Sequence, residues 1–462
     1  MISFDINKDS FSRVHFIGIG GISMSALAEI LIKEGFEVSG SDSKDSPIIN
    51  KLRDKGATIY IGHESNNIKD GLDLVVFTDA ISKDNPEYLE ALNKKILTVD
   101  RGNFLGQLMK KYKDSIAVSG THGKTTTTGM LSTILHSSHL DPTILLGGEL
   151  DCINGNVRIG KDNLILTEAC EYKGNILKFH STIGVILNVE ADHLDYYNSI
   201  DEIIDTFSGF VKLIPRDGHV IINNDDENAI KSVSDAVCNV VTFGIDKDST
   251  YKANNVSFDQ SGHSYFSLTI DNNESYDVVL SVTGIHNVYN SLGAIAAAHI
   301  SGLDIKEVIE KIKDYKGTHR RLEYKGYFDG VRVIDDYAHH PTEIMATLKA
   351  VRNLEFKKTW CIFQPHTYTR TKSLLNEFSD AFFDADKVII ANIYAAREKD
   401  NGEIHSKDLV KMLKEKNVDA YHFDTFDEIV EFISKNVSEG DLVLTMGAGD
   451  VYKIGEILLD RN

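Results

Sequence analysis

Three segments of the 462-residue chain repeat one order: an apolar strand, a polar or glycine-rich loop, and a helix. They begin at Val14 (VHFIGIGG), Ser115 (SIAVSGTHGKTTTT) and Val331 (VRVIDDYAHHPTE). Strands that alternate with helices form mainly parallel sheets. Each helix carries the chain back to the end of the sheet where the previous strand began, so the next strand runs in the same direction. The sequence therefore predicts an α/β fold: a Rossmann-like N-terminal domain, a central P-loop ATPase-like domain with a mainly parallel sheet, and a Rossmann-like C-terminal domain.

The length of the chain supports three domains, because one hydrophobic core rarely serves a protein of this size. We place the N-terminal domain at residues 1–112, the central domain at 113–317 and the C-terminal domain at 318–462. Strand-like runs with polar turns between Val241 and Val282 predict an antiparallel patch in the central domain. The small residues from 284 to 302 predict a helix after it.

The composition excludes several classes of partner. The formal net charge is −20, and DNA and anionic membranes, which are polyanions, repel an acidic protein. No apolar run is long enough to cross a bilayer, and the polar N-terminus is unlike a signal peptide. The four cysteines are scattered and form no CxxC pair, which is typical of reduced core residues. We therefore expect a cytoplasmic protein with no nucleic-acid partner and no membrane insertion.

The segment GIGGISMSAL (residues 18–27) is similar to a dinucleotide-binding loop, with Ser23 in the position of the third glycine. Glycines let the backbone approach a diphosphate, and the helix N-terminus attracts its charge. Asp42, at the end of the next strand, is placed to bond a ribose hydroxyl. A tight turn with no ligand explains the same residues about equally well, and nicotinamide is only one of several diphosphate ligands such a loop holds.

The segment GTHGKTTTT (residues 120–128) predicts a phosphate-binding loop of unusual length. The general motif has a glycine where this chain has Val118, but a strand precedes the segment and a helix follows it. Lys124 is expected to bridge the β- and γ-phosphates, and a following hydroxyl is expected to hold Mg²⁺. A chance run of small polar residues is the alternative.

Two acidic segments end apolar runs and are candidates for the Mg²⁺ ligands. They are TEACE, with Glu168 and Glu171, and NVEADHLD, with Glu190, Asp192, His193 and Asp195. The carboxyl ends of parallel strands meet at one edge of a sheet, so both segments are expected beside the phosphate loop. Solvated acids that close a strand are the alternative for each residue taken singly.

The third domain gathers cationic and aromatic side chains. Arg320 and Arg321 lie at the domain junction, where an arginine fork suits phosphate oxygens. The loop DDYAHHPTE and the segment FQPHTYTRT bring histidines to two strand ends, with Arg370 suited to a carboxylate. The histidine spacing lacks the pattern of a zinc site, so binding of a phosphate or a carboxylate is the favoured interpretation.

Seven segments occur in one order between residues 15 and 371: HFIGIGGISMS, GTHGKTTTT, NVEADHLD, GIHNVYN, GTHRRLE, DDYAHHPTE and FQPHTYTRT. Together they resemble the Mur ligases of peptidoglycan synthesis, over essentially the whole chain. The family's loop is G-T-x-G-K-[ST], which accounts for the missing glycine at Val118. The resemblance implies that ATP, with Mg²⁺, activates the carboxylate of UDP-N-acetylmuramic acid as an acyl phosphate. L-alanine then forms the amide, with ADP and phosphate as products; the two-histidine loop and FQPH favour this member over its sister ligases.

The resemblance also implies roles for individual residues. ATP is expected at Gly120, Thr121, His122, Gly123, Lys124, Thr125, Thr126, Asn287, Asn290, Arg320, Arg321 and Asp336, and Mg²⁺ at Thr125, Glu168 and His193. The UDP-sugar is expected at Gly20, Gly21, Met24, Ser25, Asp42, His63 and Arg101, and the alanine and acyl-phosphate end at Tyr337, His339, His366 and Arg370. The expected catalytic residues are Lys124, His193, Arg321 and His339. The resemblance leaves open whether Arg320 or Arg321 reaches the γ-phosphate.

The chain departs from the family pattern at several positions, and two of these departures bear on the amino acid and on a carbamate. Thr367 stands where several relatives have an arginine, so Arg370 is expected to hold more of the alanine carboxylate. Phe207 stands where sister ligases carry a carbamylated lysine, so no carbamate is expected.

Three other functions explain part of the sequence. A recycling ligase that attaches a preformed peptide to UDP-N-acetylmuramate shares the motifs of the first two domains. A nicotinamide-dependent dehydrogenase uses the GIGG loop but leaves GTHGKTTTT and NVEADHLD unexplained, and a non-catalytic nucleotide-binding switch does not need the histidine-rich loops. The oligomeric state, monomer or homodimer, stays open.

Overall fold

A computed structural model describes residues 5–6, 11–161, 163–193, 196–259, 262–352, 354–396 and 398–461. Its chain forms two compact units. The first comprises Met1–Glu190, Asp201–Ser249 and Gly293–Val308, and the second comprises Ala191–Ile200, Thr250–Leu292 and Ile309–Asn462. None of the helices within these described ranges is both long enough and apolar enough to cross a membrane.

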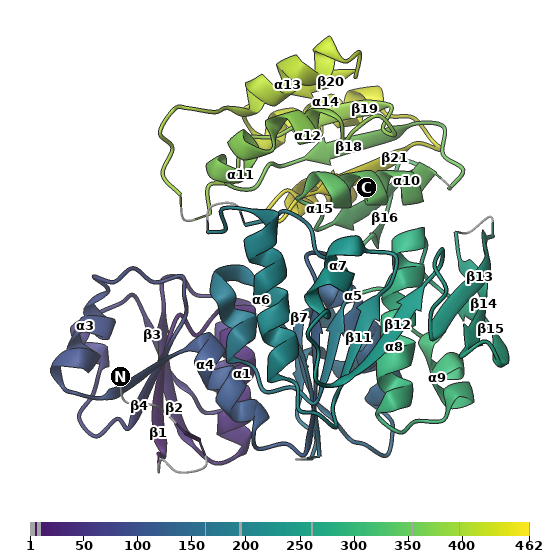
Figure 1. Ribbon diagram of the computed structural model, residues 1–462. Helices are drawn as coiled ribbons and strands as arrows, with labels where there is room; N and C mark the ends of the chain where they lie inside the picture. Colours follow the sequence, from purple (N-terminus) through teal and green to yellow (C-terminus); the bar gives the residue numbers. More distant parts are fainter. Residues whose placement is uncertain are drawn as a thin grey trace. The chain divides into compact units, whose positions relative to one another are not determined.

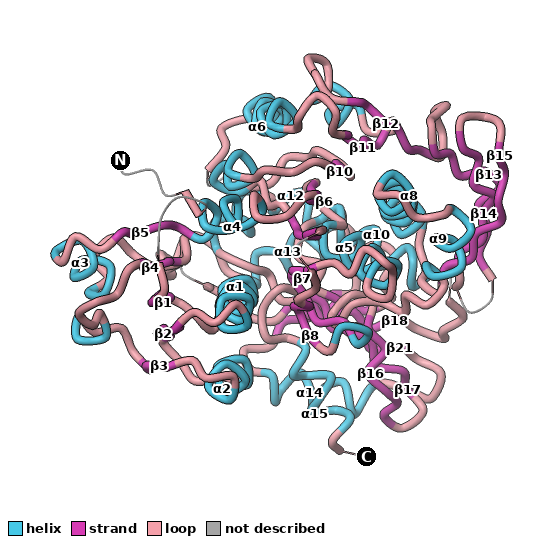
Figure 2. The backbone as a smooth tube through the Cα atoms, turned by 90° about the horizontal axis from the view of Figure 1, so that it is seen from below, coloured by secondary structure: helices cyan, strands magenta, loops and turns pink. Residues whose placement is uncertain are grey.

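The N-terminal sheet of the first unit, in purple and blue in Figure 1, is parallel. Its strand order is β3-β2-β1-β4-β5, as Figure 2 shows. Its strands are β1 (Arg13–Ile17), β2 (Glu37–Asp42), β3 (Thr58–Ile61), β4 (Leu74–Phe77) and β5 (Leu97–Asp100). Its helices are α1 (Ile22–Lys33), α2 (Pro47–Asp54), α3 (Pro86–Asn93) and α4 (Arg101–Met109), with η1 (Ser65–Asn67) between β3 and β4. Helices α1 and α4 cover one face of the sheet and α3 the other (Figure 2). The predicted Rossmann-like domain is confirmed, and its glycine loop joins β1 to α1.

The central sheet places the phosphate-loop strand among parallel neighbours. Within the first unit its order is β12-β11-β10-β6-β9-β7-β8, parallel except for the β7–β8 pair. The strands are β6 (Asp114–Ser119), β7 (Thr143–Leu150), β8 (Gly155–Arg158), β9 (Leu164–Glu168), β10 (Ile183–Ile186), β11 (His219–Asn223) and β12 (Asn239–Gly244). They alternate with α5 (Lys124–Leu135), η2 (Asp151–Ile153), η3 (Tyr172–Lys178), α6 (Ile200–Leu213) and α7 (Glu227–Ser232). Ile116, Ala117 and Val118 in β6 are all fully buried, which explains the continuous apolar run before the loop.

The antiparallel patch lies in the second unit and is shorter than predicted. It consists of β13 (Tyr251–Phe258), β14 (Ser264–Ile270) and β15 (Glu274–Leu280), and α8 (Ile285–Ile300) and α9 (Ile305–Ile312) follow along the chain. The prediction was wrong at its start, because Val241 belongs to β12, which pairs in parallel with β11. Alternating burial, the mark of a strand with one wet face, begins only at Tyr251.

The C-terminal sheet of the second unit has the order β16-β17-β21-β18-β19-β20 and is parallel except for β16. Its strands are β16 (Glu323–Phe328), β17 (Val331–Asp336), β18 (Thr359–Phe363), β19 (Lys387–Ile390), β20 (Ala420–His422) and β21 (Leu442–Met446). One face carries α10 (Pro341–Arg352), α12 (Leu375–Ser379) and α13 (Ser406–Glu415), and the other carries α14 (Phe426–Asn436) and α15 (Tyr452–Leu459). The short α11 (Tyr368–Ser373) follows β18. The three-domain α/β fold is thus confirmed, while the boundaries at 112/113 and 317/318 stay predictions that fall between elements.

Helix α4 lies close to the backbone of η3 at Gly106. A Cβ atom at Gly106 would lie 1.9 Å from the carbonyl oxygen of Lys178, so Gly106→Ala forces two backbone segments apart. We expect the substitution to lower the free energy of unfolding by about 3 kcal/mol, as severe overpacking does. Denaturant unfolding measures the change.

The matched control is Gly209→Ala in α6. There the new methyl group would meet only the tip of the Leu177 side chain, which is 44% exposed and free to move. Alanine is preferred over glycine inside a helix, so we expect a gain of roughly 0.5–1 kcal/mol. Equal effects of the two substitutions would contradict the role given to Gly106.

Candidate active site

The GIGG loop is held by Asp42, the last residue of the neighbouring strand β2. Asp42 Oδ2 accepts the Gly20 N–H at 2.9 Å, and a Cβ atom at Gly20 would lie 2.9 Å from the same oxygen. Gly18 has a φ of +82°, a conformation that favours glycine. Asp42 therefore supports the shape of the loop, and its bond to a ribose stays a prediction.

His63 joins a buried network that sequence reasoning missed. Glu87 is fully buried in the first turn of α3, where its Oε2 accepts from Ser41 Oγ at 2.5 Å and from His63 Nδ1 at 3.2 Å. Its Oε1 accepts from Asn67 Nδ2 at 2.6 Å. Burial opposes ionisation, but the hydrogen bonds from His15, Ser41 and Asn67 outweigh it, and the pKa of Glu87 lies below its ordinary value. The network leaves Nε2 of the partly exposed His63 for other partners.

The other amino acids that are predicted to bind the UDP-sugar differ in their exposure to solvent. Gly21 is exposed at the start of α1, whereas Met24 and Ser25 are buried at 2% and 4% exposure. Arg101 Nη1 donates to Ser23 Oγ at 3.3 Å, so the serine that replaces a glycine anchors this arginine. The contacts of these residues with a sugar stay predictions.

Asn188, which follows the neighbouring strand β10, holds the phosphate loop by hydrogen bonds. Sequence reasoning did not single out this residue. Asn188 Oδ1 accepts the His122 N–H at 2.7 Å, and its Nδ2 donates to the His122 carbonyl at 3.2 Å. Its own carbonyl accepts the Thr121 N–H at 3.1 Å. Gly123, with a φ of +82°, then opens α5. The loop thus aims the N-terminal amides of a 12-residue helix at one place, which suits an anion.

The ammonium group of Lys124 lies against its own loop. It donates to the carbonyl of Gly120, to the carbonyl of Thr121 at 3.0 Å and to Glu171 Oε2 at 3.2 Å. Burial disfavours its charge, but the attraction of Glu171 outweighs burial and raises the pKa of Lys124 above its ordinary value. A buried positive charge is therefore held where phosphate oxygens are expected.

Thr125 and Glu168 form the oxygen-rich part of the predicted Mg²⁺ site. Thr125 Oγ1 donates to Glu168 Oε2 at 2.9 Å, and Glu168 Oε1 accepts the Gly147 N–H at 2.6 Å. A hydroxyl and a carboxylate are hard oxygen ligands, so this pair fits Mg²⁺. His193, the third predicted ligand, belongs to the second unit, and its part in the metal site stays a prediction.

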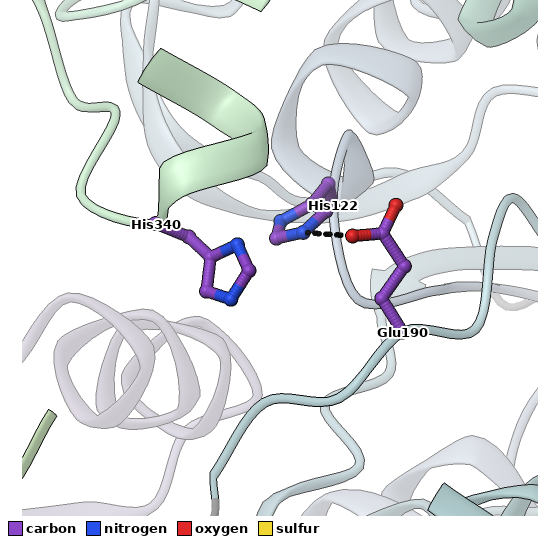
Figure 3. Close-up of side chains that lie close together, drawn as sticks. All are labelled: His122, Glu190 and His340. Carbon is purple, nitrogen blue, oxygen red and sulfur yellow. Dashed lines mark ion pairs between the residues drawn. The ribbon is translucent and has the colours of Figure 1, made fainter. Parts of the chain in front are cut away.

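The other acids of NVEADHLD have separate partners. Glu190 Oε2 lies 3.4 Å from His122 Nε2, so it pairs with the phosphate loop (Figure 3). Asp192 Oδ1, in the second unit, accepts from Arg370 Nη2 at 3.1 Å. Burial opposes ionisation of Asp192, but His193 and Arg370 hold its pKa well below the ordinary value. Asp195 lies outside the described residues.

The two asparagines predicted to bind the nucleotide meet on α8. Asn290 Nδ2 donates to Asn287 Oδ1 at 3.1 Å, and Asn287 Nδ2 donates to the Thr283 carbonyl at 2.7 Å. Both side chains are buried, so the pair is rigid. Their contact with adenine stays a prediction.

The adjacent arginines have different environments, which the sequence could not show. Arg320 donates through Nε to Asp335 Oδ2 at 3.1 Å and through Nη2 to the Gly447 carbonyl at 2.7 Å. Burial raises the pKa of Asp335 to about 6, although Thr445 and Arg320 oppose that shift. Arg321 lies over the ring of Tyr337, 4.9 Å from its centroid. Arg320 is thus tied into the fold.

Asp336, predicted to contact ATP, also supports the backbone. Its Oδ2 accepts the Leu322 N–H at 2.7 Å, and its Oδ1 accepts the Ala338 N–H at 2.8 Å and Thr347 Oγ1 at 3.2 Å. The side chain is buried, and burial raises its pKa. Asp336 therefore holds the DDYAHHPTE loop against the start of β16, and its contact with ATP stays a prediction.

The structure brings the four residues predicted for the alanine end into one group. The rings of Tyr337 and His339 lie 5.4 Å apart, and those of His339 and His366 lie 5.7 Å apart. Arg370 Nη1 lies 3.2 Å from His366 Nδ1. Tyr394, which sequence reasoning missed, stacks on His366 at 5.8 Å. Burial lowers the pKa of His339 to about 3, so its ring is uncharged at neutral pH.

Thr367 and Phe207, which depart from the family pattern, both have defined places in the fold. Thr367 is the N-cap of α11, and its Oγ1 accepts the Arg370 N–H at 3.4 Å. Phe207 is fully buried in α6 and offers no amine for a carbamate.

His286, near the start of α8, makes the stability of the fold depend on pH. Burial lowers its pKa from 6.5 to about 4, although Glu343 opposes the shift. Between these values the unfolded chain binds a proton that the folded chain does not, so stability falls as the pH falls. We expect His286→Gln to reduce this loss by about 1.4 kcal/mol per pH unit. Urea unfolding across this range tests it, and parallel stability curves would contradict the prediction.

The three sheets correspond to three matches with known protein families. Residues 13–113 match "Mur ligase family, catalytic domain", residues 118–298 match "Mur ligase middle domain", and residues 320–449 match "Mur ligase, glutamate ligase domain". Together these matches cover most of the chain.

Relatives and solved structures match the chain over almost its whole length. A UDP-N-acetylmuramate–L-alanine ligase of Clostridium botulinum (strain Loch Maree / Type A3) is 51% identical over 459 residues, which are 99% of this chain and 100% of the relative. The crystal structure of a UDP-N-acetylmuramate–alanine ligase from Thermotoga maritima has a TM-score of 0.82 and 31% identity, and covers 97% of this chain and 98% of its own. A murein peptide ligase from Psychrobacter arcticus 273-4 has a TM-score of 0.74 and 26% identity, with 97% and 98% covered.

Proposed function

The chain belongs to the Mur ligase family, and from this premise we propose that it joins L-alanine to the carboxylate of UDP-N-acetylmuramate with ATP. The products are UDP-N-acetylmuramoyl-L-alanine, ADP and phosphate. The observation that carries this function is the match of the whole chain, at 51% identity, to a relative that bears this activity in its name. The peptide-recycling alternative has weaker support, because the murein peptide ligase is only 26% identical. A nicotinamide-dependent dehydrogenase does not explain the phosphate loop.

Activation of the carboxylate is the chemical problem that the site solves. A carboxylate resists attack by an amine because it is negatively charged and lacks a good leaving group. Transfer of the γ-phosphoryl group of ATP to it gives an acyl phosphate, and the amine of alanine then displaces phosphate. Such transfers depend chiefly on position and on stabilisation of charge, which the protein supplies as fixed groups.

In the first unit, the phosphate loop and Lys124 bind the β- and γ-phosphates. Lys124 is already charged, so it exchanges its carbonyl contacts for phosphate oxygens without a change of protonation. Thr125 and Glu168 are the residues that would hold Mg²⁺, with His193 as the further ligand. When bound, Mg²⁺ neutralises phosphate charge.

The sugar nucleotide and alanine bind at the two other loops. The GIGG loop and His63 receive the UDP-sugar, with Asp42 as the support of the loop. Tyr337, His339, His366 and Arg370 receive alanine and the acyl phosphate. An uncharged His339 does not repel the amine of alanine. The protein acts in the cytoplasm, where ATP and UDP-sugars are present, as a monomer or a homodimer.

Phosphate release from ATP tests this function directly. With UDP-N-acetylmuramate present, we expect L-alanine to stimulate phosphate release, and a preformed tripeptide not to do so. Stimulation by the tripeptide alone would support the recycling ligase instead.

Lys124→Ala should abolish turnover and leave binding of the UDP-sugar nearly unchanged, as measured by calorimetry. Loss of UDP-sugar binding with ATP binding retained would refute this assignment of sites.

The two arginines give a second test, because we assign the γ-phosphate to Arg321 and a structural role to Arg320. Arg321→Lys should lower kcat roughly tenfold or more, since lysine lacks the planar fork. Its effect on stability should stay within about 0.5 kcal/mol. Arg320→Lys should lower the free energy of unfolding by about 1–3 kcal/mol, because Asp335 and the Gly447 carbonyl lose their partner. The opposite pattern would reverse the assignment.

A further inference from the structure

A group of three potential metal ligands lies at the edge of the C-terminal sheet, on residues with no part in the proposed reaction. His422 ends β20, Asp424 follows it, and His405 precedes α13. One ligand atom from each residue lies within 4.8 Å of the other two. We propose that His405, His422 and Asp424 bind a divalent transition metal of the Zn²⁺ class.

The hydrogen bonds of His422 define which of its nitrogens can bind a cation. Its Nδ1 lies 2.9 Å from the carbonyl oxygen of Ile390, which can only accept, so Nδ1 carries a proton. In the uncharged ring, Nε2 then has a lone pair. A ring nitrogen that donates to a backbone carbonyl while the other nitrogen faces outward is the usual arrangement of a metal-binding histidine.

The lone pair of His422 faces an acceptor. Nε2 lies 3.1 Å from Asp424 Oδ1, and a carboxylate oxygen has no proton to give. Two acceptors at this distance need a positive charge between them, which is either a second proton on the ring or a metal ion. The side chain of His422 is only 7% exposed, so the pair is fixed in place, while Asp424 is 65% exposed and open to ions.

His405 favours the metal over the proton, because it brings a second imidazole. The rings of His405 and His422 lie 5.2 Å apart at an angle of 82°. Two imidazoles and one carboxylate suit Zn²⁺ and related ions better than Mg²⁺, which prefers oxygen ligands. Asp424 is itself positioned, since its carbonyl accepts from Asn392 Nδ2 at 2.7 Å and its N–H donates to Glu428 Oε2 at 3.1 Å.

Two existing interactions compete with the metal. His405 Nδ1 accepts the Lys407 N–H at 3.1 Å and caps α13. That bond is lost whichever nitrogen of His405 binds the ion, because Nδ1 then either carries the proton or donates its lone pair to the metal. The ammonium of Lys407 lies 3.5 Å from Asp424 Oδ1, the oxygen that also faces His422, and its charge repels a cation there.

The test is a calorimetric titration of the full-length protein with Zn²⁺ in excess Mg²⁺, without nucleotide. Wild type should bind one equivalent that His422→Gln and Asp424→Asn weaken roughly tenfold or more. His139→Gln, on an exposed histidine of the first unit, is the matched control and should bind as wild type does. Lys407→Gln should bind several-fold more tightly, because its ammonium no longer competes.

The variants show whether His422 and Asp424 bind a metal ion or only share a proton. Unchanged binding in both His422→Gln and Asp424→Asn would overturn the proposal, as would the absence of a Zn²⁺ equivalent in wild type. Tighter binding in Lys407→Gln cannot arise from misfolding, so it supports the site even where another variant unfolds. Since the titration needs no turnover, its result is independent of the proposed ligase function.

Discussion

The hydrogen bonds of Asn188 to the phosphate loop are the constraint on which the proposed ATP site depends. A loop that is two residues shorter between its glycines than the general P-loop has less backbone with which to surround phosphate by itself. Asn188, just beyond the end of β10, bonds both backbone groups of His122 and, through its own carbonyl, the N–H of Thr121. Because β10 pairs with β6 in parallel, the two strands end at the same edge, and the support comes from the neighbouring strand.

The same device recurs at the other two loops. Asp42 ends β2, beside β1, and accepts the backbone N–H of Gly20. Asp336 ends β17 and accepts the backbone N–H groups of Leu322 and Ala338. In each case a polar side chain at the end of a strand fixes the backbone of a loop. Other backbone groups of the loop, or neighbouring side chains, are left for a ligand. Asp42 and Asp336 thus stabilise the backbone of their loops, and their contacts with a ligand stay predictions.

The sequence predicted the helices and strands well, because hydrophobic periodicity and composition reflect the burial of each segment of the chain. The start of the antiparallel patch was missed, since pairing direction depends on which strand lies alongside, and Val241 pairs with β11. Lys124, Thr125 and Glu168 could be found from motifs, and the structure places these three together. Glu87 and Asn188 could not, because each acts through residues far away in the chain, and an isolated Glu or Asn carries no periodic signal. The difference between Arg320 and Arg321 likewise depends on Asp335 and Gly447, which the sequence cannot connect.

The buried charge of Lys124 is paired with Glu171, and this limits what ATP would gain from the lysine in the proposed reaction. Glu171 neutralises Lys124 in the free protein, so the lysine does not pay the full cost of an isolated buried charge. In the proposed reaction, phosphate oxygens take the ammonium and leave Glu171 beside a polyanion, which reduces the attraction that ATP gains. Transition-state charge grows on the transferred phosphoryl group, where a fixed ammonium is worth most. Under the proposed function, a lysine that is charged and placed in advance, but shared with Glu171 in the ground state, would therefore favour phosphoryl transfer over tight binding of ATP.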